Sequence, residues 1–433
     1  MRGVGRPGAG TGGNRPRSPR GPPGCGAAPL RGPGAGDPRP AVLLQELRGG
    51  AGAGAGAEAG ARGGAWREAE ADLGPRLFLE LFEHLAYVET RGKRPWNGPF
   101  HLLGRRWAQA EEGAVAARVS GGAALLGMLA GRGAGAGASA ERRAQGFDDA
   151  RSAAALASLN RLAGLPRPHT EWRWFALARL LEREGGREEL WQLERLAASM
   201  ALRGCTKYER VRRLARALEA CGEECAAPLH WGGTRGARGA AGAAGGEAPA
   251  GAAVDALALT AGERAATLEA LDRGVYDVAH GGSALCRAVL LRAEDFWAAR
   301  EGSLPGGAPP GPGPGPGLGG GGRGLTVEHV LPKLVERGSP WETAFSPAER
   351  AALTHRLGNL ALVPGAQNRE AARLGFRYKK KLFLGAGTPG AAGPRTLRLT
   401  AGLGEFREWD ARAVRARQAD ILELLGWGWD LRG

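Results

Sequence analysis

The sequence predicts an α+β protein that is predominantly helical, with a helical region followed by a small C-terminal unit of two strands and a helix. Two observations about apolar residues lead to this fold class. Apolar residues recur at helical spacing through much of 76–300, and two short apolar runs flank a capped helix between 325 and 363. The third observation is composition, because 75 glycines and 28 prolines among 433 residues include long tracts that cannot bury enough apolar surface to fold. These Gly/Pro/Ala-rich segments are predicted to be disordered.

The balance of charge favours a polyanionic partner. Lysine and arginine outnumber aspartate and glutamate by 59 to 44, which gives a net charge of +15 and an isoelectric point near 10.5. Each contact between a cation and a phosphate releases condensed counterions, so a basic protein gains affinity for nucleic acid. Codon bias toward G and C is the alternative source of arginine in the glycine-rich tracts. We therefore expect a nucleic-acid partner.

Cysteine usage and hydropathy set the expected compartment. The five cysteines are scattered, and the CGEEC sequence at 221–225 has no second Cys or His pair at zinc-site spacing, so reduced intracellular thiols are expected. No stretch resembles the apolar core of a secretory signal, and none approaches the roughly 18 apolar residues needed to span a bilayer. The sequence predicts a soluble intracellular protein without membrane contact, and it leaves open cytoplasm, nucleus or organelle, as well as the oligomeric state.

Composition shifts divide the chain into parts. Flexible low-complexity tracts separate segments that have usable hydrophobic periodicity. The predicted parts are a disordered tail at 1–75, a helical region at 76–300 with Gly-rich inserts at 130–140 and 232–253, a Gly/Pro linker at 301–324, and a C-terminal domain at 325–433.

The helical region is predicted from amphipathic periodicity and capping residues. The run PRLFLELFEHLAYVE at 75–89 places leucines at helical spacing, and helical patterns continue through 148–227. Thr260 and Glu263 form the sequence signature of a capping box before another helix. Several arginines lie on the expected polar faces, where they either form a salt-bridged surface or follow a phosphate backbone: Arg179, Arg183, Arg210, Arg212 and Arg213.

The C-terminal unit begins with a predicted strand in LTVEHVLP at 325–332. Alternation places His329 on one face of this strand and Glu328 on the other, and Pro332 ends it. A helix follows, with Ser346 as N-cap, and Gly358 is expected to stop it.

A second strand is predicted at 359–363, closed by Pro-Gly, and a helix is predicted to run from near Gln367 through residue 384. The strands and helix thus carry His329, Asn359 and Asn368 in that order. This order is similar to the ββα-metal layout of HNH nucleases. Within the intervening helix, His355 is interpreted as a surface residue.

The residue types suit hydrolysis of a phosphodiester. His329 is the expected general base, because imidazole titrates near neutral pH. Glu328 and Asn368 offer oxygen ligands suited to Mg²⁺ or Mn²⁺. Asn359 is expected to orient the His329 ring through its second nitrogen. Three consecutive lysines on the last predicted helix are candidates for nucleic-acid phosphates: Lys379, Lys380 and Lys381.

The sequence pattern is also similar to a known family. LTVEHVLP at 325–332, RLGNLALV at 356–363, Asn368 and FRYK at 376–379 resemble the C-terminal HNH domain of GmrSD-type modification-dependent restriction endonucleases. The closing segment EWDARAVRARQADILELLGWGW at 408–429 resembles that family as well, and the helices that end in TKYERVRRLARAL resemble its helical middle region. The resemblance implies a DNA endonuclease of the HNH type.

The resemblance has a limit. The nucleotide-dependent domain with a DGQQR-type motif, which is typical of full-length family members, has no counterpart among these residues, so nucleotide dependence is not expected from the sequence. The alternative function is a catalytically inactive HNH-fold module that binds nucleic acid or protein. Loss of cleavage on substitution of His329, with binding retained, separates the two.

Overall fold

The computed structural model describes residues 58–92, 103, 107, 112–132, 146–181, 186–220, 252–276, 282–301, 324–385 and 396–432. The predicted Gly-rich inserts and the Gly/Pro linker lie almost entirely outside these residues. The described part is mostly helical, with one small antiparallel sheet of two strands. The mixed, mainly helical fold class is therefore confirmed at this level.

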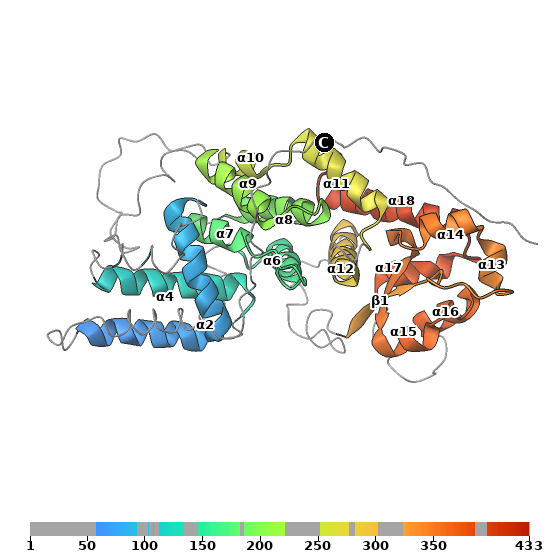
Figure 1. The fold of residues 1–433 in the computed structure, drawn as a ribbon, viewed down its shortest axis with the longest axis horizontal. Helices are drawn as coiled ribbons and strands as arrows, with labels where there is room; N and C mark the ends of the chain where they lie inside the picture. The colour runs from blue at the N-terminus through green and yellow to red at the C-terminus, as the bar shows by residue number, and fades with distance from the viewer. Residues whose placement is uncertain are drawn as a thin grey trace, which may run out of the picture.

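Most of the helices before the sheet occupy one side of the molecule, and α12 lies between them and the C-terminal elements, whereas α11 lies beside α18 (Ala411–Gly428) (Figure 1). None of the described helices is long and apolar enough to cross a membrane. In chain order these helices are α2 (Glu58–Thr90), α4 (Glu112–Leu129), α6 (Ala150–Ala163), α7 (Trp172–Leu180), α8 (Arg187–Leu202), α9 (Lys207–Ala220), α10 (Ala252–Leu257), α11 (Ala261–Arg273) and α12 (Gly282–Arg300).

The first helix begins earlier than the sequence predicts. α2 starts at Glu58, and its first half contributes Trp66 and Leu73 to the core, so the predicted disordered tail at 1–75 is too long. α2 is kinked at Gly74, which has φ 73°, and Pro75 follows directly. The predicted helix at 75–89 is thus the second half of a longer element, and the Gly/Ala-rich composition of its first half concealed the buried side chains.

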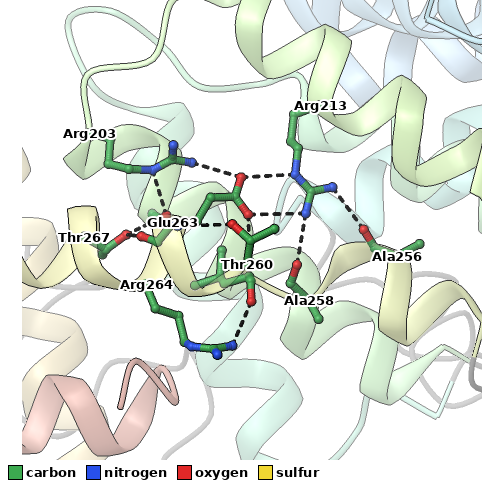
Figure 2. A network of polar contacts seen from close by, with 10 residues as sticks. Arg203, Arg213, Ala256, Ala258, Thr260, Glu263, Arg264 and Thr267 are labelled. Carbon is green, nitrogen blue, oxygen red and sulfur yellow. Dashed lines mark hydrogen bonds and ion pairs between the residues drawn. The ribbon is translucent and has the colours of Figure 1, made fainter. Parts of the chain in front are cut away.

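A network of arginines and one carboxylate joins three helices of this region (Figure 2). Glu263, on the first turn of α11, accepts from Arg213 at 3.1 Å and from Arg203 at 3.4 Å. Its capping box with Thr260 is formed as the sequence predicts. Arg213 also donates to the carbonyls of Ala256 and Ala258. The guanidinium groups therefore tie α8, α9 and α11 together.

Two further arginines from the polar-face set are paired inside the helical region. Arg179 bonds Glu189 at 2.7 Å, and Arg210 forms a two-pronged bond with Glu171 at 2.8 Å for each pair of atoms. A nearly buried guanidinium that is bonded to a carboxylate cannot reach a phosphate backbone. For these arginines the structure supports the salt-bridged alternative.

The sheet pairs β1 (Leu325–His329) with β2 (Leu360–Pro364), antiparallel, with Leu325 opposite Pro364 and His329 opposite Leu360. Its two faces belong to two cores. Leu360 and Leu362 pack into the large core of the helical region, whereas Ala361 and Val363 pack into a second core. The remaining C-terminal elements are α13 (Pro340–Ala344), α14 (Pro347–Leu353), η3 (Leu357–Asn359), α15 (Gly365–Ala371), α16 (Phe376–Phe383), α17 (Arg398–Ala401), η4 (Gly402–Glu405) and α18 (Ala411–Gly428).

Two boundaries differ from the predictions. α14 ends at Leu353, before Gly358, although its Ser346 cap forms as expected. Gly358 is needed for close packing instead, since a Cβ there would lie 2.4 Å from the carbonyl oxygen of Val414 on α18. The predicted helix from Gln367 to 384 is divided into α15 and α16, because the backbone leaves the helical region at Ala372 (φ 30°, ψ −110°).

Candidate functional site

The site is centred on the last residue of β1. His329 is only 4% exposed, and its Nε2 lies 3.1 Å from Nδ1 of His355, in the turn that follows α14. The two rings are nearly perpendicular, with centroids 5.1 Å apart. One ring donates its N–H to the other, in an order set by the tautomers. Because His355 is exposed, the pair connects a buried imidazole to solvent.

Tyr276, which follows α11 in the helical region, packs against both imidazoles. Its ring stacks on that of His355, with centroids 5.0 Å apart and an angle of 7° between the ring planes. With His329 it forms a T-shaped contact, with ring centroids 4.7 Å apart. Its hydroxyl oxygen accepts a hydrogen bond from Nζ of Lys333 at 2.7 Å. A segment remote in sequence thus contributes one wall of the site.

Both imidazoles are held neutral. Burial lowers the pKa of His329 to about 3, and the nearby Lys333, then His355 and then Lys379, lower it further. Burial and then the charge of Lys333 also lower the pKa of His355. At neutral pH each ring therefore keeps one nitrogen without a proton.

Asn359 does not orient the His329 ring in the way predicted. Its side chain is fully buried, and its Oδ1 accepts from the Leu331 amide at 2.7 Å and from the Trp409 indole at 3.1 Å. Its Nδ2 donates to the carbonyls of Leu331 and Thr354, at 3.0 and 2.8 Å. The side-chain amide of Asn359 thus makes four hydrogen bonds, all of them within the protein. Asn359 therefore fixes the loop that follows His329, and it positions the imidazole only through the backbone.

Glu328 and Lys379 form a buried ion pair on the opposite face of β1. Nζ of Lys379 lies 2.6 Å from Oε1 of Glu328 and also donates to the carbonyl of His329 at 2.7 Å. The lysine is fully buried, and burial lowers its pKa although Glu328 acts in the opposite direction. Lys379 therefore cannot contact nucleic acid as the sequence suggested, because its ammonium group is enclosed and already bonded.

The other three predicted site residues lie on α15 and α16. Nδ2 of Asn368, on α15, donates to Oγ1 of Thr326 at 2.8 Å and to the Val327 carbonyl at 3.2 Å, so this residue joins α15 to β1. Lys380 bonds the carbonyl of Phe406 at 2.8 Å, whereas Lys381 is exposed. Of the three lysines, Lys381 is the one that solvent reaches freely.

The predicted divalent-metal site does not fit this arrangement. The carboxylate of Glu328 binds an ammonium group, and this face of β1 is opposite to the one that carries the His329 ring. Across the described ranges, no three His, Cys, Asp or Glu side chains are grouped so that they could hold a metal ion. No step of the chemistry below is therefore assigned to a cation at Glu328 and Asn368.

Sequence reasoning missed three residues that the structure places beside His329. His355 was interpreted as a surface residue, and it is exposed, but its Nδ1 contacts the buried imidazole. Its position four residues before Asn359, in the loop that must return to β1, was an available signal. Tyr276 and Lys333 gave no such signal, since their contacts depend on how α11 docks onto the C-terminal elements.

The fold and the site define a mainly helical protein with a C-terminal strand pair that carries a histidine site. Residues 277–424 match the family model of the GmrSD restriction endonucleases, C-terminal domain, which confirms the resemblance over this segment. The match includes α12, so it begins before the domain boundary predicted at 325. Searches of curated proteins and of solved structures found no significant match to the chain. The segment 277–424 is accordingly similar to the C-terminal domain of those restriction endonucleases.

Proposed function

We propose that the C-terminal part hydrolyses phosphodiester bonds in DNA, with His329 as the general base that activates water. The observation that carries this proposal is the contact of 3.1 Å between His329 and the exposed His355 at the end of β1. A neutral imidazole can accept a proton from water, and a second ring in contact with it offers that proton a route to solvent. The family match supports DNA as the substrate.

The low pKa of His329 fits this role once the substrate is considered. A base with a pKa of about 3 is weak at neutral pH; burial is the main cause of the low pKa, and Lys333, then His355 and then Lys379, lower it further. A bound phosphate would offset the field of these cations and raise the pKa of the imidazole. On this proposal the base gains strength when the substrate is present.

The divalent cation expected from the sequence stays a separate proposal, since the donors predicted for it are not arranged to hold one. Cleavage assays with Mg²⁺, Mn²⁺ or Ni²⁺, and with EDTA, decide it independently of His329. If Glu328 holds that cation, it must release Lys379, and Glu328→Gln would then weaken the dependence of cleavage on the metal.

The test is cleavage of plasmid DNA by the full chain and by His329→Ala. We expect the rate to fall by roughly 10²- to 10⁴-fold, the usual contribution of a general base. His84→Met, which changes a histidine buried in the helical region, is the matched control and should cut at the wild-type rate. DNA binding that persists without cleavage by the wild-type chain under any of these conditions would instead favour an inactive binding module.

A further inference from the structure

Lys333 is a cation beside the histidine pair that has no carboxylate partner among the described residues. It is exposed, its Nζ bonds the Tyr276 hydroxyl at 2.7 Å, and it lies 4.5 Å from the centre of that ring. An ammonium group has three N–H donors, and the phenol oxygen takes one. The remaining donors face solvent.

Neighbouring cations are engaged differently. Lys379 is paired with Glu328 at 2.6 Å, and Arg356, next to His355 in the chain, is paired with Asp272 at 3.0 Å. Their charges are offset by carboxylates of the chain, whereas that of Lys333 has no such partner among the described residues. An external anion near the histidine pair would therefore interact mainly with Lys333.

Tyr276 holds Lys333 in a defined place. The phenol ring is fixed by its stacking on His355 and by the edge of His329. The chain before it is anchored too, because Gly274 has φ +112° and a Cβ there would approach the His355 carbonyl oxygen to 3.1 Å. The hydroxyl accepts from Lys333 through its oxygen, so its own O–H is available to donate. Two donors thus sit next to each other on one anchored support.

From this geometry we infer that Lys333 and the Tyr276 hydroxyl form a phosphate-binding subsite for the DNA backbone, adjacent to the His329–His355 pair. The inference rests on the proposed function and specifies how that site holds its substrate. The ammonium supplies charge and the phenol supplies a directed hydrogen bond to the same phosphate. Proximity to the reacting groups is supported by the effect of Lys333 on the pKa of both imidazoles.

The inference also gives the helical region a part in substrate binding. Tyr276 directly follows α11, yet its hydroxyl lies at the site formed by β1 and the turn after α14. The salt bridge between Asp272 and Arg356 holds this junction together. Docking of the helical region onto the C-terminal elements therefore completes the subsite.

The experiment measures binding of a short fluorescent DNA duplex to the full chain by anisotropy, in EDTA and at several salt concentrations. Lys333→Met should weaken binding roughly 10-fold, as expected for one charge-assisted contact. The slope of log affinity against log salt should shrink by about 0.9, the value for one lost phosphate contact. Lys207→Met, which removes an exposed lysine of α9 that is paired with Glu83 of α2, is the matched control and should leave the slope unchanged.

A second variant tests whether the two residues hold one phosphate. Tyr276→Phe keeps the ring that packs on the histidines and removes the hydroxyl, so a several-fold loss of affinity is expected. Combined with Lys333→Met, it should add little, because contacts to one shared group are not additive. Fully additive losses, or equal losses for Lys333→Met and Lys207→Met, would overturn the subsite.

These results separate the subsite from the proposed function. Binding is measured without cleavage, so His329→Ala should bind DNA like the wild-type chain. Binding that depends on Lys333 in a chain that never cuts would support the subsite and overturn the nuclease proposal. Cleavage that depends on His329 but not on Lys333 would do the reverse.

Discussion

The helical region and the histidine site treat buried and exposed charge in opposite ways. In the helical region, Glu194 on α8 is 1% exposed and binds Arg292 of α12 at 3.1 Å, Ser158 of α6 at 2.7 Å and the Trp429 indole at 3.0 Å. At the site, Lys333 and His355 remain accessible to solvent and have no carboxylate partner in the described ranges. One region uses its charges to join helices, and the other leaves them available.

The difference shows that net charge is a poor guide to where an anion binds. Arg210 and Arg213 contribute to the positive balance of the chain, yet carboxylates bind both inside the helical region. A single exposed lysine without such a partner is better placed to bind a phosphate than several arginines that are paired with carboxylates. The partners of each charged residue must therefore be known before an anion-binding site is assigned.

The sharpest test of the helical side of this comparison is Glu194→Ala. It leaves Arg292 buried, with Asp295 at 3.8 Å as the remaining carboxylate, and it removes the acceptor of Trp429. We expect the free energy of unfolding to fall by about 3 kcal/mol or more, the usual cost of leaving a buried charge unpaired. Urea denaturation followed by tryptophan fluorescence measures this change.

Glu83→Ala is the control for Glu194→Ala. Glu83 pairs with Lys207 at 2.8 Å, but both side chains are largely exposed, so the expected loss is below about 1 kcal/mol. Equal losses for the two variants would show that Glu194 is not the buried junction described above.

Much of the fold was predictable because local signals agreed with the tertiary structure. Both capping boxes, at Thr260 and Ser346, form as their sequences indicate, and the two predicted strands pair. The break at Ala372 was not predictable, since a non-glycine residue has no intrinsic preference for φ 30°. The start of α2 was missed because glycine and alanine dominate its first half.

The site was harder to predict. Alternation along β1 placed Glu328 and His329 on opposite faces correctly, but it gave no sign that Glu328 binds the ammonium group of Lys379. The roles of Asn359 and Lys379 depend on partners distant in sequence, Trp409 and Glu328. Residue type and order indicated which residues belong to the site. The bonding partner of each side chain could be known only from the three-dimensional packing.

Lys379→Met tests the internal ion pair on the far face of β1. The change leaves Glu328, which is 8% exposed, without its cation, and we expect a loss of about 2 to 3 kcal/mol in the free energy of unfolding. Adding Glu328→Gln should restore most of it, because replacing both charges removes the unpaired one. Thermal denaturation of the single and double variants measures both effects. If the double variant were less stable than Lys379→Met, the pair would not be the source of the loss.

The smallest expected effect concerns the pH dependence of stability, and it compares His84 with His329. His84 is buried in α2, neither ring nitrogen has a hydrogen-bond partner among the described residues, and burial lowers its pKa from 6.5 to about 3. Between those pH values the unfolded chain binds a proton that the folded chain does not, so stability falls as pH drops below 6.5. His84→Met removes this contribution, and the loss between pH 7 and about pH 5.5 should shrink by about 1 kcal/mol relative to the wild-type chain. Urea titrations at the two pH values measure it, and an unchanged pH dependence would mean that His84 is protonated in the folded protein. Burial lowers the pKa of His329 to about 3 as well, but its contact with the exposed His355 gives that imidazole a route to solvent which His84 lacks.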